Sequence, residues 1–77
     1  MKKVIFLIEY EGNVLAFFPE EKYDNQGNMI CFDGEFSRCP LFYAKDECKI
    51  ATPDQYKEIK AILENEYKYE LKVMKSW

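Results

Sequence analysis

Two short apolar runs near the start of the chain predict two adjacent strands. In residues 3–11, every position from Val4 to Ile8 is apolar, so both faces of an extended chain are apolar here. A strand of this kind is typical of the centre of a sheet that is covered on both sides. A turn at Gly12 separates it from a second strand at residues 14–18, and the two strands predict a β-hairpin.

The next segments predict a third strand and then a less regular region. Pro19 lacks a backbone N–H, so it ends the second strand or lies at an edge or bulge. Residues 24–28 combine Asp, Asn and Gly, which tolerate positive φ and predict a turn. A third strand is expected at residues 28–36. Residues 37–51 have no clear period, but their aromatic side chains indicate a segment that packs over the rest of the protein.

The clearest local signal is the start of a helix at Thr52. Thr52 suits the N-cap, Pro53 suits the first helical position, and Gln55 completes a capping box. The carboxylate of Asp54 adds a favourable charge at the positive end of the helix. The apolar residues that follow share one stripe of a helix: Tyr56, Ile59, Ile62 and Leu63.

The end of the chain allows two interpretations. In residues 67–73, apolar or aromatic side chains alternate with charged ones, which is a strand pattern. In the alternative, the helix continues through residues 67–75, with Leu63, Tyr67, Leu71 and Met74 on one face. We favour the strand, because the alternation is unbroken and because aromatic and β-branched side chains suit a sheet.

These elements predict one small α+β domain over residues 1–77. Their order is β-β-β-loop-α-β, and a right-handed crossover through the helix would place the last strand parallel to the first. The expected sheet is four-stranded and mostly antiparallel, with the spatial order 3-2-1-4 and one helix packed on one face. The other face must be covered either by residues 36–43 folding across it or by a second chain.

The composition argues against most enzymatic chemistry. The chain contains no histidine, so the commonest general base and metal ligand is missing. Ser37 and Ser76 are the only serines, and neither has an ordinary basic relay partner. The scattered glycines form neither a P-loop nor a dinucleotide-binding fingerprint. We therefore predict a protein that is not an enzyme and that uses no cofactor.

Three cysteines, Cys31, Cys39 and Cys48, support an alternative hypothesis. An odd number does not suit a secreted disulfide framework, so free thiols in the reducing cytoplasm are expected. Their spacing lacks the close pairs of a structural zinc site. A thiol- or metal-dependent function through these residues is the alternative to a pure interaction role, and Arg38 is a cation that would favour the thiolate of Cys39.

Neither a nucleic acid nor a membrane is expected as a partner. Aromatic residues make up 17% of the chain and could stack bases, so a single-stranded nucleic-acid binder is a further alternative. Such binding also needs a positive groove, whereas the formal net charge is −3. The longest apolar runs are far shorter than the roughly 20 residues that a membrane-spanning helix needs.

Self-association is the leading functional hypothesis. The chain is 48% hydrophobic, and a domain of this size buries only about 60% of the surface that its unfolded chain exposes. We therefore predict a non-enzymatic, cytoplasmic protein-interaction domain that forms a homodimer through an apolar sheet face or a strand edge. An unidentified protein partner is the alternative to a second copy. The expected interface residues are Ile5, Leu7, Leu15, Phe17, Phe42 and Trp77.

Short motifs spread over most of the chain carry a resemblance to a protein family. They are Phe17-Phe18-Pro19-Glu20, the turn at Gly27, Cys31, Cys39-Pro40, Ala51-Thr52-Pro53 with Tyr56, and Glu70-Leu71-Lys72-Val73. On these motifs the sequence resembles a family of small uncharacterised proteins of gut Bacteroidales. The resemblance implies one small α+β domain and no assigned activity. Such proteins often have a glycine just before the last strand, where Glu66-Tyr67-Lys68 stands here.

Overall fold

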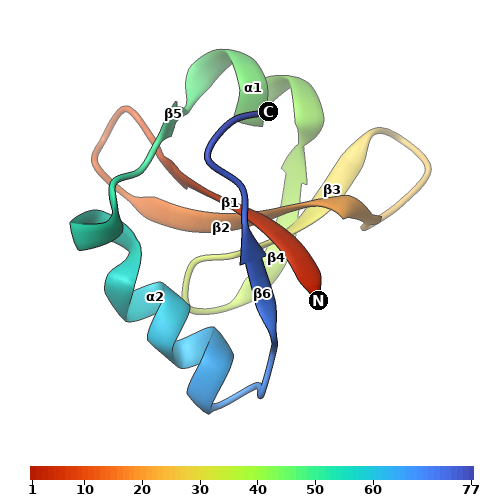
Figure 1. The fold of residues 1–77 in the computed structure, drawn as a ribbon. Helices are drawn as coiled ribbons and strands as arrows, with labels where there is room; N and C mark the ends of the chain where they lie inside the picture. The colour runs from red at the N-terminus through yellow and green to blue at the C-terminus, as the bar shows by residue number, and fades with distance from the viewer.

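The computed structural model describes residues 1–77 and has an α+β fold (Figure 1). Its elements, in chain order, are β1 (Lys2–Ile8), β2 (Val14–Lys22), β3 (Asn28–Phe32), β4 (Phe36–Pro40), α1 (Leu41–Glu47), β5 (Lys49–Ile50), α2 (Pro53–Asn65) and β6 (Leu71–Val73). The predicted α+β class is therefore confirmed, with additional short strands and a second helix. Neither helix has the length and apolar character that crossing a membrane requires.

Strand β1 is the centre of the sheet. It pairs antiparallel with β2, and Ile5 lies opposite Phe17 in that register. Its other edge is shared by two short strands: β6 runs parallel to its first half, and β5 runs antiparallel to its second half. Strands β3 and β4 extend the sheet beyond β2, which gives the order β4-β3-β2-β1-β5 with β6 beside β1. The predicted order 3-2-1-4, with a parallel last strand, is thus present inside a wider sheet.

Both faces of β1 are buried, as its apolar pattern predicts. Val4 and Phe6 point to the face that α2 covers, where they belong to one core cluster with Leu63. Ile5 and Leu7 point to the opposite face, where they belong to a second core cluster. Their exposed fractions are 2% and 0%, so neither face of the strand is open to solvent.

Helix α2 starts at the predicted capping box. The backbone N–H of Thr52 donates to Gln55 Oε1 at 2.8 Å, and the backbone N–H of Gln55 donates to Thr52 Oγ1 at 3.4 Å. These bonds satisfy donors that the first turn of a helix otherwise leaves unpaired. Beyond the cap, the ring of Tyr56 stacks on the ring of Phe6, which fastens the helix to the central strand.

The second face of the sheet is covered by the chain itself. Residues 41–47, which were expected to be irregular, form α1, and its Ala44 is fully buried in the second core cluster. Figure 1 shows α1 far from α2, with the C-terminus beside it. There Trp77 packs edge-on against Phe17, with ring centroids 5.4 Å apart. A segment of the same chain therefore covers this face, but it is residues 41–47 and not 36–43, because residues 36–40 belong to the sheet as β4.

The predicted third strand is wrong at its far end. Residues 28–36 do not form one strand, because the chain reverses at residues 33–35 and returns as β4. Gly34 has a φ of +117°, a conformation that side chains with a Cβ rarely adopt. Strand β2 is longer than expected and continues past Pro19, with a register shift between Phe17 and Lys22. Pro19 therefore does not end the strand, which was one of the expected alternatives, but lies in the stretch where the register shifts.

The predicted last strand is confirmed in type but is shorter than expected. It begins at Leu71, and α2 ends at Asn65, so the alternative of a continued helix is not what forms. Between them the backbone reverses at Lys68, whose φ of +58° is the only positive φ outside glycine. The backbone N–H of Tyr69 then donates to the carbonyl of Leu63 at 3.1 Å, which holds the connection against the end of the helix.

Candidate functional site

The outer edge of β4 has no neighbouring strand. Strand β4 ends the sheet order, and its residues Phe36, Ser37 and Arg38 are all exposed. By contrast, the opposite side of β1 is divided between two strands of only two and three residues. The five-residue edge of β4 is therefore longer than the edges of β5 and β6, and such edges are templates for pairing with another chain.

The hydrogen bonds at both ends of the β3–β4 hairpin establish which groups face outward. The backbone N–H of Asp33 donates to the carbonyl of Glu35, and the backbone N–H of Leu41 donates to the carbonyl of Gly27. In an antiparallel ladder, this alternation makes Ser37 and Cys39 the residues bonded to β3. The backbone groups of the intervening residues Phe36, Arg38 and Pro40 then point away from the sheet, and Pro40 has no N–H to offer.

Phe36 lies at the centre of an aromatic cluster beside this edge. Its ring centroid is 4.7 Å from that of Phe32, 5.0 Å from that of Tyr67 and 6.2 Å from that of Tyr69. Phe32 is fully buried, whereas Phe36 is 40% and Tyr67 43% exposed. The cluster therefore has a buried base and an exposed apolar surface. We call Phe36, Tyr67 and Tyr69, with the outer backbone of β4, the edge site.

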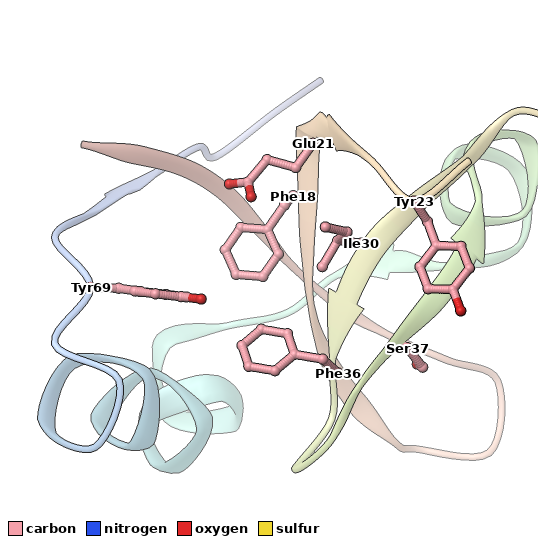
Figure 2. Close-up of a pocket in the computed structure, with 7 residues that line it drawn as sticks. All are labelled: Phe18, Glu21, Tyr23, Ile30, Phe36, Ser37 and Tyr69. Atoms are coloured by element: carbon pink, nitrogen blue, oxygen red, sulfur yellow. The ribbon is translucent and has the colours of Figure 1, made fainter. Parts of the chain in front are cut away.

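A cavity of about 280 Å³ opens between the edge site and β2. Figure 2 shows the rings of Phe18, Phe36 and Tyr69 around one space, contributed by β2, β4 and the segment before β6. Ile30 on β3 adds to the lining, and Glu21 supplies a carboxylate. Helix α2 packs against β1 and β2, and none of its residues lines this space.

The charged side chains around the cavity form one ion pair and two cation–aromatic contacts. Lys2 Nζ donates to both carboxylate oxygens of Glu21, at 2.8 and 2.9 Å, and lies 4.9 Å from the ring centroid of Tyr69. On the other side, the Arg38 guanidinium lies 6.0 Å from the ring centroid of Tyr23. Cations at such distances from an aromatic face are attracted to it. Arg38 therefore has one ring beside it while its side chain remains exposed.

The three cysteines lie on the opposite face of the sheet, next to α1. Cys31 and Cys39 are buried and Cys48 is half-buried. The neighbouring Cys39 thiol, helped by Ser37, whose Oγ lies 3.3 Å from Cys31 Sγ, lowers the pKa of Cys31 from 9.0 to about 7. The Cys31 thiol, together with burial, raises the pKa of Cys39. Burial and then the Glu9 carboxylate raise the pKa of Cys48. No group of three or more acidic, cysteine or histidine side chains is arranged to hold a metal ion.

The sheet face that was expected to bind a partner is not accessible. Ile5, Leu7, Leu15 and Phe17 are at most 4% exposed, because α1 and the C-terminal segment lie over them. This part of the predicted interface is corrected to an internal core. Trp77 is 44% exposed, although its ring packs against Phe17. Lys45 Nζ lies 5.5 Å from the centroid of the Trp77 ring. Phe42 remains at the surface, 69% exposed.

The residues that form the edge site were not among the predicted interface residues. The sequence pattern puts Phe36 at the end of the third strand and puts Tyr67 and Tyr69 within the last strand. A signal was present, since Asp33-Gly34 is a favoured hairpin turn and Phe36-Ser37-Arg38 alternates after it. Reading that turn as a reversal would have predicted β4 and its unpaired edge.

Comparisons of the chain with protein-family models, with curated proteins and with solved structures found no match. The role of the edge site is therefore inferred from its geometry, its exposed surface and its charges.

Proposed function

We propose that the protein is a non-enzymatic interaction domain that pairs with a second copy of itself through the edge site. The observation that carries this proposal is the unpaired outer edge of β4, where the backbone groups of Phe36 and Arg38 point to solvent. Addition of a strand to an exposed edge is a recurring mode of protein recognition, because main-chain hydrogen bonds supply affinity and side chains supply specificity.

The aromatic cluster supports the same surface. Phe36 and Tyr67 are each about two-fifths exposed, and they adjoin the edge rather than lying scattered over the surface. Contiguous exposed apolar residues mark interaction sites, and aromatic side chains are enriched in them. A strand added at β4 would cover both the unpaired backbone and part of these rings, so one contact would bury both features.

Self-association and a cytoplasmic location are parts of this proposal. A homodimer needs only one surface that is complementary to itself, and an edge strand meets this requirement in an antiparallel arrangement. The three cysteines are unpaired, which suits a reducing compartment. Cys31 and Cys39 are buried in the second core cluster, so other thiols have little access to them.

The test compares Arg38→Pro with Arg38→Lys. Proline removes the outward N–H of residue 38 but no hydrogen bond to β3, so this variant should fold and lose self-association. Lysine keeps the N–H and the charge and should still associate. Sedimentation velocity at micromolar concentrations measures the outcome, and circular dichroism checks the fold. A wild-type protein that stays monomeric throughout, or a proline variant that associates as well as the wild type, would overturn the proposal.

A further inference from the structure

We propose that the two copies pair in a single register, with Ser37 opposite Ser37 of the partner subunit and Phe36 opposite Arg38 of the partner subunit. The partner's Arg38 would then lie against Phe36 beside the aromatic cavity, so each copy supplies a residue to the site of the other. This inference rests on the proposed function, because it specifies how the β4 edges meet.

Backbone geometry restricts the registers that a two-fold axis can produce. New antiparallel bonds form between residues whose N–H and C=O groups face the incoming strand. On β4 these are Phe36 and Arg38, with only the carbonyl available at Pro40. In the register centred on Ser37, each Phe36 meets an Arg38, and every outward group of these two residues gains a partner.

The neighbouring registers are less favourable. Centring on Arg38 places two guanidinium groups opposite each other, and like charges in facing positions are destabilising. It also pairs Phe36 with Pro40, which leaves the Phe36 carbonyl without a donor. Centring on Phe36 brings Gly34 opposite Arg38, but Gly34 lies in the turn outside the strand. The Ser37-centred register avoids all three problems.

The side chains agree with this register. Phe36 and Arg38 lie opposite Phe32 and Ile30, respectively, in β3, so both point to the face of the sheet that bears the cavity. Directly opposed residues of antiparallel strands have Cβ atoms about 5 Å apart. The partner's Arg38 would therefore reach the exposed ring of Phe36.

In this arrangement the Arg38 guanidinium would lie between two rings. One is Tyr23 of its own chain, 6.0 Å away, and the other is the partner's Phe36. Arginine stacks well on aromatic faces because its guanidinium is planar and weakly hydrated.

Site-specific cross-linking tests the register. We would prepare Phe36→Cys and Arg38→Cys separately, mix them and oxidise the mixture. Facing residues of a hydrogen-bonded pair lie about 5.5 Å apart at Cα, which suits a disulfide. The mixed dimer also keeps one intact Phe36–Arg38 pair. We expect a covalent dimer in the mixture and little in either variant alone or in the wild type.

The outcomes separate the register from the proposed function. A covalent dimer of Arg38→Cys alone or of Phe36→Cys alone would identify a different register and overturn this inference. A wild-type dimer in sedimentation, with no cross-link in an associating mixture, would do the same while leaving the proposed function intact. A monomeric wild type would remove both. As a second measurement, Phe36→Ala and Arg38→Ala should each weaken dimerisation about tenfold, and the double variant little more.

Discussion

The ring of Tyr56 lies almost flat against the ring of Phe6, with centroids 4.1 Å apart and an interplanar angle of 14°. Phe6 is buried in the central strand, and Tyr56 belongs to the second turn of α2, just beyond the capping box. The stack therefore joins the capped N-terminus of α2 to the central strand β1. It sets the position of α2 on one face of the sheet.

Replacing Tyr56 should destabilise the packing of α2 on the sheet. We expect Tyr56→Ala to lower the free energy of unfolding by about 2 kcal/mol, because a half-buried ring and a stacking contact are lost. Tyr56→Phe keeps the ring and should change the stability by less than about 0.5 kcal/mol. Urea unfolding followed by circular dichroism measures both. Equal effects of the two substitutions would mean that the hydroxyl, and not the stack, stabilises the fold.

Lys68 should be a site where glycine stabilises the protein. A residue with a Cβ pays roughly 1 kcal/mol to adopt the left-handed conformation that Lys68 has at a φ of +58°. Lys68→Gly is therefore expected to raise the free energy of unfolding by up to about 1 kcal/mol, less the extra chain entropy of glycine. Lys68→Ala removes the charge but keeps the Cβ, and it should not stabilise. The prediction fails if both variants behave alike in thermal unfolding.

The thiols should make the stability depend on pH. Folding lowers the pKa of Cys31 from 9.0 to about 7, so ionisation of this thiol stabilises the folded state. The contribution is complete above pH 9.0, where the unfolded chain is ionised as well. This contribution is lost as the pH falls through about 7. The pKa values of Cys39 and Cys48 are raised in the folded state, so the unfolded chain ionises first. These two thiols therefore lower the free energy of unfolding as the pH rises above 9.0. We therefore expect the free energy of unfolding to rise between about pH 7 and pH 9 and then to fall.

Thiolate absorbance in the ultraviolet assigns the titration. One thiolate should form with a midpoint near pH 7 in the wild type and disappear in Cys31→Ser. Cys39→Ala should move the midpoint upward, because the Cys39 thiol is the main cause of the lowered pKa. Cys48→Ser serves as the control and should leave the midpoint in place. A wild type without thiolate below pH 8 would contradict the assignment.

Much of the fold could be predicted from the sequence because its strongest signals coincide with its core. The unbroken apolar run in β1 predicts a strand buried on both faces, and both faces are buried. The capping box at Thr52 predicts the start of α2, and both of its hydrogen bonds form. These signals are local and redundant, so no tertiary contact is needed to interpret them.

The elements between β3 and α2 could not be predicted in the same way. Helix α1 has a single fully buried residue, Ala44, and no side-chain cap, so its sequence contains neither an apolar stripe nor a start signal. Its position depends on the second core cluster, which residues far apart in the chain assemble. The reversal at Lys68 was equally hidden, because the alternation of residues 67–73 is that of a strand and the left-handed turn lacks a glycine.

The sequence does not reveal the edge site for a related reason. The sequence indicates which side chains are apolar, but not which of them the chain covers itself. Leu7 and Phe17 looked like an interface because nothing in the sequence shows that α1 folds over them. Phe36 is expected at the end of a strand and at the start of a covering segment, whereas it lies beside an edge that no strand covers. Only the three-dimensional structure distinguishes apolar residues that the chain covers itself from those that stay exposed.

The parallel pairing of β1 with β6 has a consequence for how the protein is made. Lys2 lies opposite Leu71, and the backbone N–H of Lys2 donates to the carbonyl of Glu70 at 2.8 Å, so β1 pairs with a strand almost 70 residues later in the chain. During translation, β1 leaves the ribosome long before its neighbour exists. The nascent β1–β2 hairpin therefore lacks its β6 neighbour until residues 71–73 have been made, so the cooperative folding step follows their synthesis.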